Sequence, residues 1–140
     1  MKFRNWSLVI ISICIFIITG CSNILENEDQ RIEVQKNIGD NEYEDFKVVT
    51  DNNEVMQVKK ILKDTTFENK KVEMSRPPDY QFVFQFKNPK IEAKAVSYQI
   101  WVSANKEKIE IKAGDNRYAQ LEGKHAATLF QIVTGKKLAE

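Results

Sequence analysis

The sequence contains little of the side-chain chemistry on which enzymes usually depend. Its 140 residues include one histidine, His125, and two cysteines, Cys14 and Cys21. A lone histidine is more often a surface or capping residue than a general base, and the sequence shows neither a nucleophile elbow nor a glycine-rich phosphate loop. We therefore expect no catalytic residue and no cofactor. A carboxylate-dependent enzyme is the one catalytic alternative, because Asp and Glu number 20 and their separations are not visible in a sequence.

The sequence also lacks an excess of charge of one sign. Lys and Arg number 21 and Asp and Glu number 20, so the formal net charge is +1. This balance gives no reason to expect nucleic acid or a strongly acidic polymer as a partner.

Long hydrophobic runs are absent beyond the N-terminus. Lys2 and Arg4 precede an uncharged stretch from Trp6 to Thr19, which is 14 residues long. A membrane-spanning helix needs about 20 apolar residues. The stretch is also apolar on all sides rather than along one stripe, which argues against a buried amphipathic helix. A basic start followed by a short apolar core is typical of a secretory signal peptide.

The apolar stretch ends in Ile18-Thr19-Gly20-Cys21, which resembles the lipobox of bacterial lipoproteins, with Ile and Thr where Leu and Ala or Ser are commonest. The resemblance implies that residues 1–20 are a signal peptide and that Cys21, lipidated with acyl chains such as palmitate, becomes the first mature residue. It also implies that the protein is held at the extracytoplasmic face of the cell membrane. Ordinary cleavage that leaves Cys21 as a free thiol is the alternative, and the flanking residues disfavour it.

The mature chain is expected to form one monomeric domain. Removal of residues 1–20 leaves 120 residues, and loss of the two basic residues among them changes the formal net charge from +1 to −1. With Cys14 removed and Cys21 lipidated, no thiol remains for a disulfide or a thiolate metal site. We expect residues 21–30 to be a lipidated cysteine with a flexible tether, and residues 31–140 to be the domain.

Patterns of strand and helix alternate along the domain. Alternating apolar and polar residues predict strands at 31–35, 43–50, 71–74, 80–86, 95–103, 106–113 and 117–121. Apolar residues on one helical face predict helices at 53–63 and 123–134. Asp51 begins a run of N-cap residues, Gly135 fits a C-cap, and Lys136 and Lys137 follow where the helix dipole favours cations. The order predicts an α+β fold, with two helices on one face of an antiparallel sheet of about five to seven strands, preceded by the signal peptide.

Two of these strands can be aligned around a tight turn at Asn105-Lys106. If Ala104 pairs with Glu107, the apolar residues of both strands fall on one side. The pairs on this apolar side are Val102 with Ile109 and Ile100 with Ile111. Trp101 then faces Glu110 on the opposite, polar side.

The segments YQFVFQF, SYQIWVS, KIEIKAGDNRYAQL and LFQIVTG together resemble the YhfM-like domain of small Bacillus-type lipoproteins, over roughly residues 45–136. The resemblance implies a lone domain on a lipid anchor and no particular activity. Cys21 is the only functional residue that it carries over.

Trp101 is the candidate surface contact, and Val83 shares its parity in a neighbouring strand. An exposed tryptophan on a flat sheet suits contact with a peptide, a glycan or a partner protein. The alternative is that a loop, the N-terminal strand or the last helix covers the ring, and the high average burial of tryptophan favours this alternative. The row of alternating aromatics is expected in the core under the helices; it consists of Tyr80, Phe82, Phe84 and Phe86.

No metal site is expected. Asp40–Asp45 is the richest carboxylate cluster, but it lacks the glycine and the terminal glutamate of a calcium loop. Zinc would need clustered histidines, cysteines or acids.

Three classes of function are open. We expect a non-catalytic interaction or accessory module, held at the membrane by lipid on Cys21, with a protein or other envelope component as partner. A small-ligand-binding lipoprotein is the first alternative, although solute receptors of transporters need two lobes, so only a minor pocket would serve. The second alternative is the carboxylate enzyme. An open aromatic sheet face favours the first class, a closed apolar cavity the second, and a dry cleft with two carboxyls the third.

The anchor is directly testable. Cys21→Ala should abolish labelling of the protein by a clickable fatty acid and leave uncleaved precursor, because no other thiol stands at a lipobox. In-gel fluorescence after metabolic labelling measures this. Equal labelling of the wild type and the variant would contradict the anchor.

Overall fold

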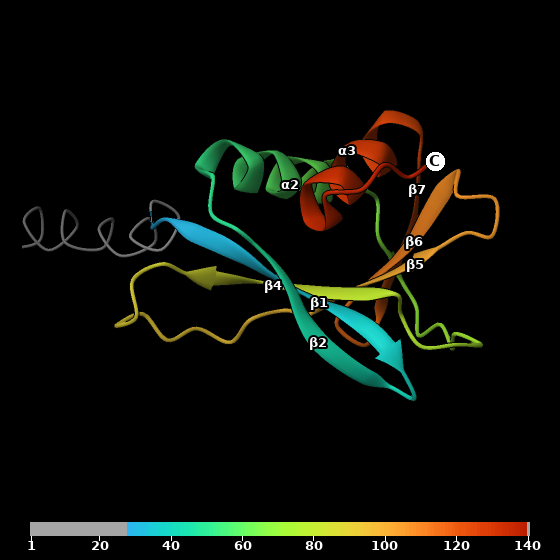
Figure 1. The fold of residues 1–140 in the computed structure, drawn as a ribbon, viewed down its shortest axis with the longest axis horizontal. Helices are drawn as coiled ribbons and strands as arrows, with labels where there is room; N and C mark the ends of the chain where they lie inside the picture. Colours follow the sequence, from blue (N-terminus) through green and yellow to red (C-terminus); the bar gives the residue numbers. More distant parts are fainter. Residues whose placement is uncertain (1–27, 140) are drawn as a thin grey trace, which may run out of the picture.

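The computed structural model describes residues 28–139 (Figure 1). The elements follow the chain as β1 (Gln30–Gly39), β2 (Glu42–Val49), α2 (Asn52–Asp64), β3 (Glu68–Asn69), β4 (Tyr80–Phe86), β5 (Tyr98–Val102), β6 (Lys108–Ala113), β7 (Arg117–Glu122) and α3 (Gly123–Thr134). The predicted signal peptide and Cys21 lie outside the described residues, so the lipid anchor stays a prediction.

The strands form a seven-stranded sheet in the order β2-β1-β4-β5-β6-β7-β3, and all neighbours are antiparallel. Both helices cover the same face, which is uppermost in Figure 1. The predicted α+β fold is therefore confirmed. Neither described helix is long and apolar enough to cross a membrane.

The start of the sheet lies earlier in the chain than the sequence indicates. The backbone N–H of Lys87 donates to the carbonyl of Asp29 at 2.9 Å, and Gln30 pairs with Phe86 across β1 and β4. The last two residues of the predicted tether are therefore held by the sheet.

The predicted helix caps are confirmed, and a tight turn joins the first two strands. Asp40 and Asn41 connect β1 to β2 with φ angles of 49° and 60°. The Asp51 side chain accepts a hydrogen bond from the backbone N–H of Glu54 at 3.0 Å and so caps α2. Gly135 ends α3 at a φ of 73°, a left-handed conformation that glycine adopts without steric cost.

The core lies between the two helices and the inner face of the sheet. Its most deeply buried side chains come from both layers: Ile32, Val34, Val58, Phe82, Ile100, Ile109, Ile111, Leu129 and Val133. Each contributes about 1.5–3 kcal/mol through removal of apolar surface from water. The aromatic row of β4 is only partly core, because Phe84 and Phe86 are half-buried.

The predicted register of β5 and β6 is confirmed. Val102 pairs with Ile109, and Trp101 pairs with Glu110. The backbone N–H of Lys106 donates to the carbonyl of Ser103 at 2.9 Å in the turn between the strands. β5 begins only at Tyr98, so the first three residues of the predicted strand are not part of it.

The predicted strand at residues 71–74 is wrong. The edge of β7 pairs with Glu68 and Asn69 instead, and the chain then leaves the edge to cross the outer face of the sheet. Lys112 of β6 donates from Nζ to the carbonyl of Val72 at 3.1 Å and helps to hold this covering segment, residues 70–79. Residues 71–74 alternate apolar and polar side chains as a strand does, but Glu68 and Asn69 already occupy the edge of β7.

The covering segment buries Trp101, which is 4% exposed. The indole Nε1–H donates to the carbonyl of Arg76 at 2.9 Å. The interpretation of Trp101 as an exposed contact is therefore wrong, and a loop covers the ring. Burial removes a large apolar surface from water while the one polar atom of the indole keeps a partner. Val83, with the same parity, is half-buried.

Replacement of Trp101 should be costly. Trp101→Ala would leave a cavity and lower the free energy of unfolding by about 3–5 kcal/mol. Chemical denaturation of residues 28–140, followed by circular dichroism, measures this loss. Trp101 is the sole tryptophan there, so the emission of the wild type reports the environment of its ring. Met56→Ala, at a residue 61% exposed, is the control and should change stability by under about 0.5 kcal/mol. Long-wavelength emission with a small stability loss for Trp101→Ala would contradict burial.

A basic cleft as the candidate functional site

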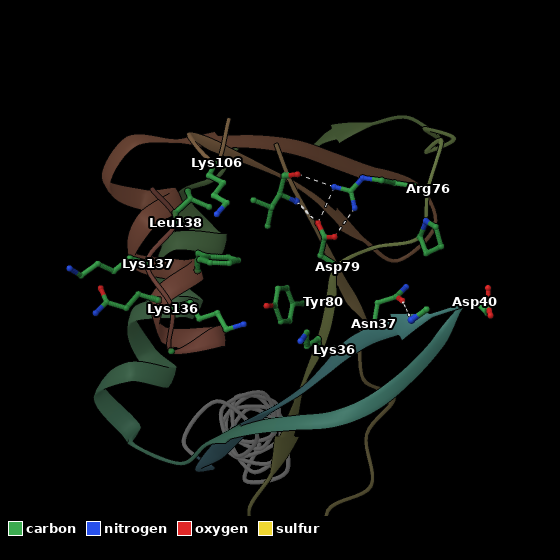
Figure 2. Close-up of a pocket in the computed structure, with 16 residues that line it drawn as sticks. Lys36, Asn37, Asp40, Arg76, Asp79, Tyr80, Lys106, Lys136, Lys137 and Leu138 are labelled. Carbon is green, nitrogen blue, oxygen red and sulfur yellow. Dashed lines mark hydrogen bonds and ion pairs between the residues drawn. The ribbon is translucent and has the colours of Figure 1, made fainter. Parts of the chain in front are cut away.

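A cleft of about 1000 Å³ opens between the β1–β2 turn, the start of β4 and the C-terminal end of α3 (Figure 2). Cationic side chains dominate its polar lining: Lys36, Arg76, Lys106, Lys136 and Lys137. Two carboxylates, Asp40 and Asp79, also line it. The near-neutral balance of the whole chain conceals this local excess of positive charge. We call this feature the basic cleft.

Two aromatic rings, Tyr80 and Phe130, belong to the apolar lining of the basic cleft, together with Pro77, Val102 and Leu138. Tyr80, the first residue of β4, meets Phe130 of α3 edge to face, with ring centroids 5.8 Å apart and an interplanar angle of 79°. Phe46 of β2 lies 5.5 Å from Tyr80 on a tilted plane. Tyr80 and Phe130 are buried. Edge-to-face pairs contribute about 0.5–1.5 kcal/mol beyond area burial, so the Tyr80–Phe130 pair adds to the stability of the core.

Two ammonium groups stand over the ring of Phe46. Lys36 lies opposite Tyr80 in the β1–β4 ladder, and its Nζ is 5.9 Å from the Phe46 centroid. Lys136 approaches from beyond α3, with its Nζ 5.6 Å from the same centroid. The ring attracts both cations. Among residues 28–139 no ion pair joins either lysine to a carboxylate, so a bound anion would supply a counter-charge.

The hydroxyl of Tyr80 is the third donor group at the basic cleft, beside the ammonium groups of Lys36 and Lys136. Figure 2 shows Lys36, Lys136 and Tyr80 together at the centre of the cleft, with the Tyr80 hydroxyl directed into it. No hydrogen bond within residues 28–139 engages this hydroxyl. A tyrosine hydroxyl donates one hydrogen bond readily to an anion. The ring is therefore packed in the core, while its polar end remains available to a ligand.

The end of α3 explains why Lys136 reaches the cleft. Lys47 donates from Nζ to the carbonyl of Ile132 at 2.7 Å, so a cation already binds the C-terminal end of the helix. Gly135 reverses the chain, and the backbone N–H of Lys136 donates to Oγ1 of Thr134 at 3.1 Å. Lys47 therefore already interacts with the negative end of the α3 dipole, so the dipole alone does not explain why Lys136 lies there as well.

Arg76 and Asp79 form a clasp on the opposite wall. The two guanidinium nitrogens of Arg76 lie 2.6 and 3.0 Å from the carboxylate oxygens of Asp79, and one also donates to the carbonyl of Val102 at 2.9 Å. The backbone N–H of Val102 donates to the same carboxylate at 2.7 Å. The hydrogen bond to Asp79 raises the pKa of Arg76. Because the charges of Arg76 and Asp79 neutralise each other, Lys36 and Lys136 supply the positive potential that an incoming anion meets.

The other predicted or weighed residues lie apart from this arrangement. His125 is exposed in the first turn of α3 and does not line the basic cleft. Within the cluster Asp40–Asp45, the Asp45 carboxylate accepts a hydrogen bond from Nε2 of Gln35 at 3.0 Å. Among residues 28–139, no group of three or more His, Cys, Asp or Glu side chains could hold a metal ion.

Sequence reasoning named Trp101 and missed the three residues that meet in the basic cleft. The alternation of β4 correctly predicts that the ring of Tyr80 lies in the core row. It gives no information about where the hydroxyl points. The sequence pattern indicates only that Lys136 interacts with the helix dipole. Only the pairing of β1 with β4 brings Lys36 beside Tyr80, and no local pattern in the sequence encodes that pairing.

A family model described as YhfM protein matches residues 26–139, which include every described strand and helix. No curated protein and no solved structure matches the chain.

The clasp should contribute to stability. Asp79→Ala removes the acceptor of the Val102 N–H and the partner of Arg76, and we expect the free energy of unfolding to fall by about 1–3 kcal/mol. The ion pair alone would give less, because both side chains are partly exposed. Chemical denaturation measures the loss. Asp115→Ala, at an exposed turn, is the matched control, and an equal effect of the two changes would contradict the clasp.

Proposed function

We propose that this chain, which belongs to the YhfM protein family over residues 26–139, has a binding function. The domain is an extracytoplasmic interaction module, anchored to the membrane by lipid on Cys21. Its basic cleft holds an acidic segment of a partner protein in the cell envelope. The lipobox-like sequence that ends at Cys21 supports the anchor, and the basic cleft supports the binding function.

The observation that carries the proposal is that three donors from separate segments line one cleft. Lys36, Lys136 and the Tyr80 hydroxyl come from β1, the end of α3 and β4, and all are directed into the same cleft. Charge-assisted hydrogen bonds are stronger than neutral ones. A carboxylate placed there would receive two such bonds and one from the hydroxyl. We assign binding and orientation of an anion to these groups, and no reaction.

The dimensions of the basic cleft favour a chain over a lone small anion. Its cations come from separate segments around a space of about 1000 Å³. Several carboxylates along one peptide would meet them together. Ile38, an exposed apolar residue beside the lining residues Asn37 and Gly39, gives such a peptide an apolar contact at the rim. The alternative is a small anionic ligand, because pockets for such ligands reach about this volume.

Neutralising the two lysines should weaken binding. We expect Lys36→Gln and Lys136→Gln each to reduce the affinity for a fluorescein-labelled oligoglutamate peptide about tenfold, which corresponds to about 1.4 kcal/mol. Fluorescence anisotropy at low ionic strength measures this. Lys124→Gln, on the exposed start of α3, is the control and should leave affinity unchanged. Equal weakening by all three would show non-specific attraction and contradict the site.

The hydroxyl can be tested apart from charge. Tyr80→Phe keeps the ring that packs on Phe130 but removes the donor, so peptide affinity should fall by about 3- to 10-fold while the thermal melt stays unchanged. Competition with inorganic pyrophosphate then separates the two ligand classes. Tight binding of pyrophosphate that excludes the peptide would favour the small-ligand alternative. Full peptide affinity in Tyr80→Phe would remove the hydroxyl from the site.

A further inference from the structure

A second concavity lies at the other end of the same strands. It has a volume of about 490 Å³ and lies between α2, the segment before β5 and the ends of β1 and β4. Its apolar lining consists mainly of Phe67, Phe84, Phe86, Val96 and Tyr98. Val96 is 46% exposed, a high value for an aliphatic side chain. We call this feature the aromatic groove.

The aromatic groove has positive charge only. Four cations line it, Lys59, Lys63, Lys94 and Arg117, and no aspartate or glutamate does. Within residues 28–139 no ion pair joins any of the four to a carboxylate. Two cations lie over rings of the groove, with Nζ of Lys59 at 5.8 Å from the Phe84 centroid and the Arg117 guanidinium carbon at 5.1 Å from the Phe67 centroid. The groove thus combines exposed apolar surface with unneutralised positive charge.

Burial adds a second consequence for Lys59. Partial desolvation lowers the pKa of its ammonium group, because the charged form loses water without gaining a carboxylate. An anion at the mouth of the groove would supply the missing counter-charge.

The position of the groove relative to Cys21 narrows the choice of occupant. Gln30 lines the groove, begins β1 and pairs with Phe86 at one end of the β1–β4 ladder. Gln30 is nine positions after Cys21, with eight residues between them, so a fully extended tether would reach about 30 Å. Lys36 and Tyr80, at the basic cleft, form the pair at the opposite end of the same ladder. The chain therefore enters the domain beside the groove and away from the basic cleft, at the left of Figure 1.

We propose that the aromatic groove docks on the anionic phospholipid surface of the membrane that holds the lipid anchor. This inference rests on the anchor of the proposed function. The cations meet headgroup phosphates, and Val96 and Phe86 enter the interfacial region, where aromatic and aliphatic side chains and basic residues act together. The short tether keeps the groove close to that surface, so docking is intramolecular and needs little intrinsic affinity. The basic cleft then faces away from the membrane.

The test uses the mature lipidated protein in vesicles. With Cys21 blocked by its thioether, Val96→Cys gives one thiol for a polarity-sensitive fluorophore. Emission should shift to shorter wavelength in vesicles that contain phosphatidylglycerol, and not in vesicles of phosphatidylcholine alone. The shift should shrink as salt screens the charges. Ile38→Cys, at a residue 54% exposed at the opposite end of β1, is the matched control and should show no shift.

Charge reversal tests the cations. Lys63→Glu combined with Lys94→Glu should abolish the shift at the Val96 label, while Lys124→Glu should leave it. Circular dichroism melts of all variants show whether the fold is retained.

The other outcomes overturn the inference in distinguishable ways. A label that is equally blue-shifted in neutral and anionic vesicles would mean that another occupant, such as the acidic tether of this chain, fills the groove. Flotation with the vesicles but no shift would overturn the docking alone. Failure to float with either vesicle would overturn the anchor, and the docking with it.

Discussion

Four aromatic side chains of β4 point to one face of the sheet, and two short helices must cover them. Phe82 lies in the middle of this row and is almost fully buried under the helices. Phe130 of α3 contacts Tyr80 at one end of the row, and Lys59 of α2 lies over Phe84 toward the other end. The remaining aromatics are left at the margins of the core, Tyr80 at one end and Phe84 and Phe86 at the other. The basic cleft and the aromatic groove occupy these two margins.

Both margins attract cations for the same physical reason. A half-buried ring presents a negative face, and a lysine or arginine can pack its alkyl stem on apolar surface while its charge stays near water. Phe46 receives Lys36 and Lys136 at one margin, and Phe84 receives Lys59 at the other. The margins differ in what accompanies the charge. The cleft adds a directed hydroxyl and two carboxylates, which suits orientation of a specific anion. The groove adds exposed aliphatic and aromatic surface without carboxylates, which suits a less specific contact with a charged surface.

The outer face of the sheet is covered by an irregular segment rather than by helices. Trp101 would expose a large ring there, and residues 70–79 cover it without forming a strand. The Arg76–Asp79 clasp fixes this segment to β5, since the Asp79 carboxylate accepts from the backbone of Val102 and the Asp79 backbone N–H donates to the carbonyl of Ile100 at 2.8 Å. Asp79 also accepts a hydrogen bond from the backbone N–H of Asn37 at 3.0 Å. One residue thus ties the covering segment to β1 and β5, next to the basic cleft.

The sequence by itself determined the elements whose signals are local. The helix at 123–134, the β4 strand at 80–86 and the register of β5 against β6 follow from apolar period, turn residues and a C-cap glycine, all within a few residues of one another. The lipobox-like motif at Cys21 is equally local. Only the tertiary structure decided that Trp101 is covered, that Glu68 and Asn69 take the strand edge in place of residues 71–74, and that Lys36, Tyr80 and Lys136 meet. Those outcomes depend on which distant segments pair or pack across the sheet. Side chains far apart in sequence share a site only after long-range contacts close, and local periodicity carries no information about their partners.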